Sequence, residues 1–127
     1  MRTRFAPSPT GPLHLGHAYS AILAHDMARA AGGAFLLRME DTDLERSRPE
    51  WEAAILADLT WLGLSWDGPV HRQSEHIAGY NARLETLAPR GLLYPCSCTR
   101  ADIRAAASAP QEGVAHAVYP GTCRGRP

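Results

Sequence analysis

The opening 39 residues constrain the fold more than any other part of the chain, because strand, loop, helix and strand patterns follow one another there. Residues 3–6 indicate a short buried strand, and a loop rich in proline and glycine separates it from a helix over residues 17–31. Gly32-Gly33 supplies the stop expected after that helix. Residues 34–39 form a nearly continuous apolar run, typical of a parallel strand covered on both faces. This succession predicts a βαβ unit, and hence an α/β fold with a parallel sheet.

Apolar spacing and local start signals predict two further helices. Pro49 marks the start of one, because proline suits the first helical turn, and acidic residues follow it where the helix dipole favours them. A turn at residues 66–69 leads to the other, which is capped near Ser74. On the first helix, the apolar residues that should share one face are Ile22, Leu23, Met27 and Ala30. The apolar stripes of the other two helices are expected in the core. They are Trp51, Ile55, Leu59 and Leu62 on the second helix and Ile77, Tyr80, Leu84 and Leu87 on the third.

The segment that begins at Cys96 is organised differently. Residues 92–96 are a candidate strand, residues 99–107 a helix capped by Thr99, and the remainder is rich in glycine and proline. We therefore expect a domain over residues 1–95 and a small insertion folded around a metal over residues 96–127.

The composition of the chain limits the classes of protein to which it can belong. The 13 basic and 13 acidic residues cancel, so the electrostatic footprint of a nucleic-acid binder is missing. All 13 basic residues are arginine, so a mechanism that requires lysine cannot be completed by these residues alone. No export signal or membrane-spanning run is present, and we expect a cytoplasmic protein that does not bind a membrane. An odd number of cysteines then argues against a disulfide scaffold.

Two polar loops follow the first two strands, and ligands of open parallel sheets bind at the carboxyl ends of strands. The first loop contains His14-Leu15-Gly16-His17, where one helical turn brings both imidazoles to the same side and Gly16 allows close backbone approach. Helix-terminal amides and imidazoles can stabilise charge on phosphates. The second loop is Glu40-Asp41-Thr42-Asp43. Its aspartates could suggest magnesium, although a loop and capping role is more ordinary for them.

The run from Arg4 to His17 resembles the first signature of the class I aminoacyl-tRNA synthetases, and its Ser-Pro-Thr-Gly lead-in is similar to that of the glutamate-activating branch. The resemblance implies a Rossmann-like catalytic fold that uses ATP with Mg²⁺. Glutamate carries two carboxylates and one ammonium group. A guanidinium that binds a carboxylate and a carboxylate that binds the ammonium group therefore complement it. By resemblance, Arg4, Ser8 and Glu40 bind glutamate together with the intervening Phe5, Ala6 and Pro7, while His14, Gly16 and His17 bind ATP and the two histidines act in catalysis.

The three cysteines are spaced for a metal site. Cys96 and Cys98 are too close for an unstrained disulfide, and with Cys123 they offer three thiolates to a structural zinc that needs a fourth ligand. Imidazole is the commoner ligand, so chemistry alone favours His116. The glutamyl-queuosine tRNA(Asp) synthetases instead carry Cys-x-Cys followed by Tyr-x-x-x-Cys, which Tyr119 matches, and on that resemblance we choose Tyr119. The alternative is three free buried thiols.

Two other stretches also resemble the glutamyl-queuosine tRNA(Asp) synthetases. They are Tyr19-Ser20 after the signature, and Trp66-Asp67-Gly68 followed by Gln73-Ser74. The resemblance implies ATP-dependent activation of glutamate and transfer of the glutamyl group to queuosine in the anticodon of tRNA(Asp), by a monomer. The alternatives are an ordinary glutamyl-tRNA synthetase that charges tRNA(Glu), a small nucleotidylyltransferase, and a non-catalytic zinc-stabilised binding fragment.

The sequence departs from the family in one respect. These enzymes close the active site with a second, lysine-containing signature loop and a later half-domain, and neither is found in these 127 residues. We therefore expect residues 1–95 to be the N-terminal half of the nucleotide-binding catalytic domain, and the chain by itself to have little or no activation activity.

Overall fold

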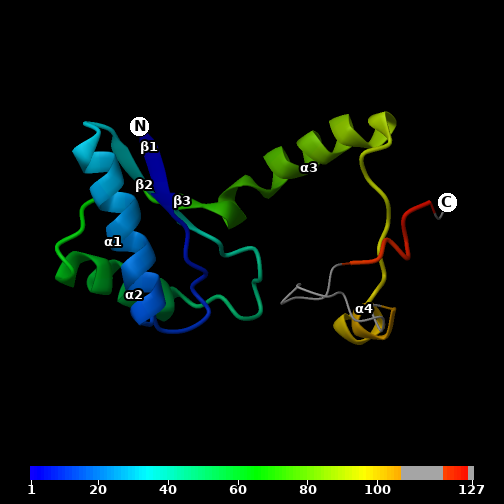
Figure 1. Cartoon of the computed structure of the whole chain (residues 1–127), viewed down its shortest axis with the longest axis horizontal. Helices are drawn as coiled ribbons and strands as arrows, with labels where there is room; N and C mark the ends of the chain where they lie inside the picture. The colour runs from blue at the N-terminus through cyan, green and yellow to red at the C-terminus, as the bar shows by residue number, and fades with distance from the viewer. Residues whose placement is uncertain (107–118, 126–127) are drawn as a thin grey trace, which may run out of the picture. The chain divides into compact units, whose positions relative to one another are not determined.

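The chain forms two compact units, Met1–Ile77 and Ala78–Pro127. The computed structural model describes residues 1–106 and 119–125 (Figure 1). The expected domain boundary between residues 95 and 96 stays a prediction.

A three-stranded parallel sheet organises the first unit. Its strands are β1 (Arg2–Phe5), β2 (Ala34–Met39) and β3 (His71–Arg72), in the order β1-β2-β3. The bounds of β2 are those expected from the sequence, and β1 begins and ends one residue earlier than expected. The two-residue β3 was not predicted, because its two polar residues carry no strand pattern and only pairing with the end of β2 defines it. The predicted α/β class with a parallel sheet is confirmed.

Helix α1 (Leu15–Ala30) joins β1 to β2; it begins two residues earlier and ends one residue earlier than the sequence predicts. Gly32 adopts a positive φ of 59°, and the amide of Gly33 donates to the Ala28 carbonyl oxygen at 2.8 Å, which closes the last turn. Gly33 also allows a close backbone approach. A Cβ atom at this position would lie 1.8 Å from the carbonyl oxygen of Met1, so only glycine fits between α1 and β2.

The buried face of α1 differs from the expected one. Ala21 and Ala28 are fully buried against the sheet, whereas Ile22, Leu23 and Met27 are 37%, 47% and 48% exposed. Apolar residues occur on both sides of this helix, so periodicity alone does not select a face. The small side chains of the buried alanines allow a close approach of the helix to the sheet.

Helix α2 (Pro49–Trp61) begins at the predicted proline and packs on the same core. Its Ile55 and Leu59 are fully buried with Phe35 and Leu37 of β2, which confirms the predicted inner face at its centre. Trp51 and Leu62 at its ends are half-buried. The α1 and α2 ribbons lie together on one side of the strands in Figure 1.

An ion pair connects β3 to α2. The Arg72 Nε atom donates to Glu52 Oε1 at 2.9 Å, and a second guanidinium nitrogen contacts the same carboxylate. The carboxylate of Glu52 raises the pKa of Arg72. This pair holds the short strand β3 against α2.

The two faces of the sheet differ in burial. Along β2, Phe35, Leu37 and Met39 are buried, while Leu36 and Arg38 between them are only half-buried. The expectation of a strand covered on both faces was therefore wrong for the described chain. The half-buried face follows directly from the alternation of side chains along a strand.

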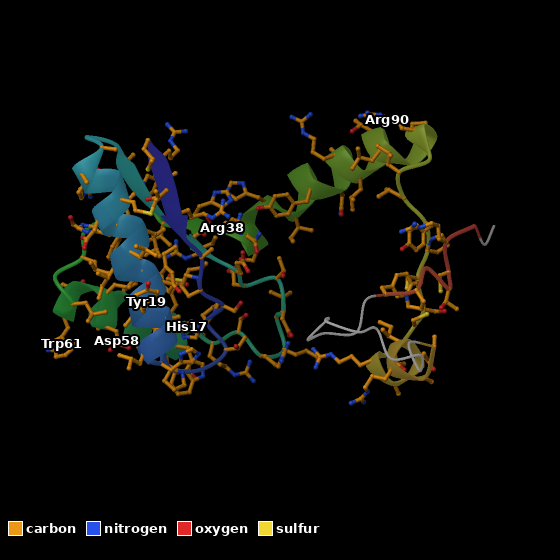
Figure 2. The ribbon with its side chains drawn as sticks, in the orientation of Figure 1. His17, Tyr19, Arg38, Asp58, Trp61 and Arg90 are labelled. Carbon is orange, nitrogen blue, oxygen red and sulfur yellow. The ribbon has the colours of Figure 1, made fainter. Side chains whose placement is uncertain are left out.

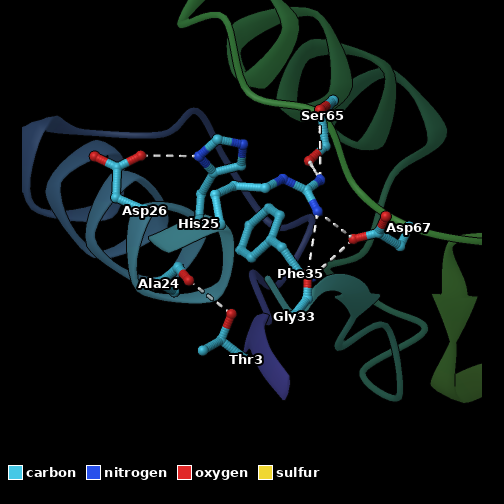
Figure 3. Close-up of polar contacts among 9 residues, drawn as sticks. Thr3, Ala24, His25, Asp26, Gly33, Phe35, Ser65 and Asp67 are labelled. Atoms are coloured by element: carbon cyan, nitrogen blue, oxygen red, sulfur yellow. Dashed lines mark hydrogen bonds and ion pairs between the residues drawn. The ribbon is translucent and has the colours of Figure 1, made fainter. Parts of the chain in front are cut away.

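A polar network fastens the turn after α2 to the start of β2 (Figure 3). Asp67 accepts hydrogen bonds from the Phe35 amide at 2.8 Å and from Arg29 at 2.7 Å, and its own amide donates to the Phe35 carbonyl oxygen. Arg29 also donates to the Ser65 carbonyl oxygen at 2.8 Å. On the other side of α1, the Thr3 hydroxyl donates to the Ala24 carbonyl oxygen.

The Asp67→Asn variant is expected to be less stable than wild type at neutral pH and nearly equal to it in acid. The Phe35 amide, followed by Arg29, lowers the pKa of Asp67, so its stabilising contribution is present above the ordinary carboxyl pKa of about 3.9. That contribution disappears as the pH falls through the lower folded-state pKa. Urea unfolding at pH 7, 5 and 3 measures the difference. Asp58→Asn is the control, because Asp58 is exposed and its side chain makes no hydrogen bond or ion pair among the described residues.

The expected apolar stripe of α3 (Ile77–Leu87), whose first residue ends the first unit and whose others belong to the second, is not core. Ile77, Tyr80 and Leu84 are 41%, 36% and 47% exposed, and Leu87 is half-buried. Helical periodicity predicted the helix correctly but does not supply a surface to cover its apolar face. No described helix is both long and apolar enough to cross a membrane.

The rest of the second unit is mostly irregular. The strand expected over residues 92–96 is absent, because no neighbouring strand pairs with this segment in the described chain. Helix α4 (Arg100–Ala106) forms as predicted and Thr99 caps it. The Asp102 amide donates to the Thr99 hydroxyl at 3.2 Å, while the Asp102 carboxylate accepts from the Thr99 amide at 2.7 Å. The 3₁₀ turns Gln73–His76 and Ala88–Arg90 precede and follow α3.

Candidate active site and cysteine cluster

The two histidines of the first loop build the N-terminus of α1. The Gly16 amide donates to Nδ1 of His14 at 3.1 Å, and the His14 amide donates to Nδ1 of His17 at 3.2 Å. The two rings are stacked, with centroids 3.7 Å apart. A Cβ atom on Gly16 would lie 3.1 Å from the His14 ring, so glycine allows this ring to lie over the helix start. The structure thus brings together all three predicted nucleotide-binding residues.

These contacts define what the imidazoles can do. Because Nδ1 of each ring accepts a hydrogen bond, each neutral ring carries its proton on Nε2, which remains available as a donor. Burial lowers the pKa of His17, and the neighbouring His14 lowers it further. The edge of the Phe5 ring contacts His17, with centroids 6.5 Å apart. The site therefore presents neutral Nε2–H donors, which suit phosphate oxygens.

The first loop and the acidic loop lie side by side at the carboxyl ends of β1 and β2. The Glu40 amide donates to the Pro7 carbonyl oxygen at 2.9 Å, and the Arg48 amide donates to the Pro9 carbonyl oxygen at 3.0 Å. A cavity of 210 Å³ opens between the loops and α2. Its lining residues are Pro9, Asp41, Leu44, Ser47, Arg48, Pro49 and Glu52.

The residues expected to bind glutamate fall into three groups. Phe5 and Pro7 are buried, and the Phe5 side chain belongs to the core, so these two can offer a ligand only their main chain. Arg4 and Ser8 are exposed. Ala6 and Glu40 are half-buried.

Arg38 contacts a predicted site residue, and sequence reasoning missed it. Its guanidinium contacts the Glu40 carboxylate, two residues further along the strand direction. Figure 2 shows Arg38 on the side of the sheet away from α1, and Arg4 lies on the same face because it pairs with Leu36. The signal was present in the sequence, since residues two apart on a strand share a face.

The two aspartates of the acidic loop are structural, as the loop and capping interpretation predicts. Asp41 is 9% exposed and accepts from the amide and the hydroxyl of Ser74, at 2.9 and 2.5 Å. Burial raises the pKa of Asp41, but the hydrogen bonds from Ser74 outweigh it and the net shift is downward. Asp43 accepts from the side chain and the amide of Arg46, which lower its pKa and close the loop. Asp41 therefore anchors the loop that carries Glu40.

The second unit brings together the four predicted zinc ligands. The sulfur atoms of Cys96, Cys98 and Cys123 lie within 4.8 Å of one another, and Sγ of Cys98 is 3.3 Å from Sγ of Cys123. The Tyr119 hydroxyl oxygen is 3.5 Å from Sγ of Cys96 and 3.9 Å from Sγ of Cys98. The other candidate, His116, lies outside the described residues.

The dimensions of this cluster fit a tetrahedral zinc ion. With Zn–S bonds of about 2.3 Å, two sulfurs on one zinc are about 3.8 Å apart, close to the spacing found here. The Tyr119 hydroxyl lowers the pKa of Cys123 to about 6, whereas the contact with Cys123 raises the pKa of Cys98. The Cys123 amide donates to the Tyr119 oxygen at 2.8 Å. The identity of the metal and its ligands stays a prediction.

Comparison with known proteins gives concordant matches. Residues 1–124 match the family of class I tRNA synthetases (E and Q), catalytic domain. The glutamyl-Q tRNA(Asp) synthetase of Rhodobacter capsulatus is 65% identical, over 100% of this chain and 48% of the relative. The enzyme of the same name from Nitratidesulfovibrio vulgaris is 51% identical, over 98% of this chain and 41% of the relative. This chain thus spans about half the length of the curated relatives that it matches.

A solved structure also matches. The crystal structure of a glutamate tRNA ligase from Elizabethkingia meningosepticum, in complex with its amino acid, superposes with a TM-score of 0.71 at 37% identity. The superposition covers 85% of this chain and 23% of that chain.

Proposed function

The chain belongs to the family of class I tRNA synthetase catalytic domains specific for glutamate and glutamine, and from this premise we propose that it binds glutamate and ATP for the formation of glutamyl-adenylate. In this step a carboxylate oxygen of glutamate attacks the α-phosphorus of ATP, and pyrophosphate leaves. A hydroxyl of queuosine in the anticodon of tRNA(Asp) then attacks the glutamyl carbonyl, so that an ester forms and AMP leaves. The Rossmann-like fold of the family, with helices flanking a parallel sheet, is the one described above.

One observation carries this proposal. The loop with the stacked histidines and the loop with Glu40 are hydrogen-bonded to each other at the carboxyl ends of neighbouring strands. The Nε2–H donors of His14 and His17 would stabilise the charge that develops on the α-phosphate, and Glu40 would hold the ammonium group of glutamate. Catalysis by positioning and electrostatics needs no covalent enzyme intermediate.

The branch of the family is part of the proposal. Identity of 65% to a glutamyl-Q tRNA(Asp) synthetase and the position of the Tyr119 oxygen beside three sulfurs support queuosine in tRNA(Asp) as the acceptor. An ordinary glutamyl-tRNA synthetase is the second candidate, because a glutamate–tRNA ligase of Maricaulis maris is 53% identical over 80% of this chain. Zinc, Mg²⁺ with ATP, and a monomeric state complete the proposal.

Binding measurements test the proposed function. We expect calorimetric titration, with a non-hydrolysable ATP analogue present, to detect glutamate binding but not aspartate binding. Glu40→Gln should weaken glutamate binding at least about tenfold, because the ammonium group loses a charge-assisted partner. Glu45→Gln, a control in the same loop with an exposed side chain, should bind like wild type.

Two results would contradict the proposal. Binding of the ATP analogue with no preference for glutamate would favour a nucleotidylyltransferase. Binding of zinc but of neither ligand would favour a non-catalytic binding protein. Mass spectrometry of tRNA(Asp) and tRNA(Glu), incubated with glutamate, ATP and this chain joined to the lysine-containing second half of the family's catalytic domain, would separate the two synthetase candidates.

A further inference from the structure

The zero net charge of the chain, which by itself argues against a nucleic-acid binder, conceals opposite charges on its two units. Residues 1–77 hold seven arginines and ten acidic residues, which gives a formal charge of −3. Residues 78–127 hold six arginines and three acidic residues, which gives +3. Because a surface of one sign attracts ligands of the opposite sign, the two units suit different partners.

The arginines of the two units also differ in their contacts. Four of the seven arginines in the first unit, all of them described, form an ion pair with a carboxylate. Five arginines of the second unit are described, and all five are exposed. They are Arg83, Arg90, Arg100, Arg104 and Arg124. None of them forms an ion pair or a side-chain hydrogen bond within the described residues. The positive charge of the second unit is therefore not balanced by its own described carboxylates.

Two of these arginines share one face of a short helix. Arg100 and Arg104 lie four residues apart on α4, and like charges at this spacing weaken a helix. Asp102 between them does not compensate, because its carboxylate accepts hydrogen bonds from the amide and the hydroxyl of Thr99. The pair thus destabilises α4 unless an anion binds it.

An aromatic ring accompanies the arginine that follows Cys123. The guanidinium of Arg124 lies over the ring of Tyr94, 5.9 Å from its centroid, and Tyr94 is 37% exposed. Tyrosine rings and guanidinium planes are groups on which proteins stack the unpaired bases of RNA. RNA offers both phosphates and unstacked loop bases, whereas an acidic peptide offers only carboxylates. Among polyanions, this combination of side chains favours RNA.

We propose that the second unit binds the anticodon arm of the tRNA, with its exposed arginines on the phosphate backbone. This inference rests on the proposed function, in which queuosine in the anticodon accepts the glutamyl group. Arginine suits the role because its guanidinium binds two phosphate oxygens at once. The first unit has a negative formal charge and repels phosphates, which leaves the second as the RNA-binding part of this chain.

Fluorescence anisotropy at several salt concentrations tests the inference, with a labelled RNA hairpin that has the sequence of the anticodon arm of tRNA(Asp). The proteins are wild type, Arg90→Gln in the turn after α3 (Figure 2), Arg104→Gln on α4, and the control Arg2→Gln. Arg2 is exposed in the first unit and also has no ion pair within the described residues, so the control removes the same charge.

We expect Arg90→Gln and Arg104→Gln each to weaken binding of the hairpin about three- to tenfold. Each should also lower the slope of the logarithm of affinity against the logarithm of salt concentration by about one, because one phosphate contact is lost. Arg2→Gln should stay within about twofold of wild type and keep the salt slope.

Other outcomes would overturn the inference. Equal weakening by all three substitutions would show an effect of net charge alone, and unchanged binding in both second-unit variants would show that these arginines do not hold the RNA. Displacement of the hairpin by polyglutamate as readily as by unlabelled hairpin would identify a site for acidic proteins. Absence of RNA binding by wild type would also overturn it, yet glutamate binding by the same protein would leave the proposed activation of glutamate standing. Circular dichroism of each variant confirms that the compared proteins are folded.

Discussion

We expect the Cys123→Ser variant to lose zinc binding, whereas wild type should hold one equivalent of zinc. Cys123 is 1% exposed, its sulfur lies 3.3 Å from that of Cys98, and its thiol has the lowered pKa in the cluster. Serine is a poor zinc ligand at neutral pH, because its hydroxyl does not ionise there. Metal content by mass spectrometry and the thiolate-to-cobalt absorption of the Co²⁺-substituted protein measure the effect.

Matched variants make this result specific. Ser97→Ala, between the first two cysteines, should bind zinc like wild type. Tyr119→Phe should weaken zinc binding and His116→Ala should not, if the hydroxyl of Tyr119 is the fourth ligand. The reverse order would identify His116 instead. Full retention of zinc by Cys123→Ser would contradict a site built from the three thiolates.

Loss of zinc should have a structural consequence within the second unit. The segment after α3 has little regular structure, and the thiol and tyrosine side chains are the principal contacts between residues 96–98 and residues 119–123. A metal that binds only the folded site stabilises it by mass action. Hydrogen exchange should therefore quicken in these residues when a chelator is added.

The Phe35→Ala variant is expected to lose about 3–5 kcal/mol of unfolding free energy, the largest effect of any single truncation in the first unit. Phe35 is fully buried at the centre of the sheet, and its ring meets the edge of His25 on α1 at a centroid distance of 5.4 Å. Small domains are stable by about 5–15 kcal/mol, so this loss removes a large share of the total. Urea unfolding followed by circular dichroism measures it.

Trp61→Ala is the matched control. It truncates an aromatic residue of similar size, but Trp61 is 84% exposed at the end of α2, so the change should stay within about 0.5 kcal/mol. Similar losses in the two variants would show that the core does not lie between α1, α2 and the sheet. A loss below about 1 kcal/mol for Phe35→Ala would contradict the packing described here.

Much of the first unit could be predicted because its signals are local. The Gly32-Gly33 stop, the proline at the start of α2 and the continuous apolar run of β2 each act within a few residues, and all three were located correctly. The Thr99 cap of α4 is another local signal of this kind. The sequence by itself also determined which chemistry is present, since the histidine loop, the acidic loop and the cysteine spacing can be read directly from it.

Only the tertiary structure decided which surfaces are covered and which distant groups meet. Periodicity showed that α1 and α3 are helices, but not that alanines would face the sheet in α1 or that the stripe of α3 would stay exposed. The pairing that defines β3 and the bonds from Ser74 to Asp41 join residues more than thirty positions apart. The physical reason is that backbone conformation depends mainly on neighbouring residues, whereas burial and ion pairing depend on what the rest of the fold brings near. The contact of Arg38 with Glu40 lies between these cases, because strand alternation placed both on one face and the fold then decided that they meet.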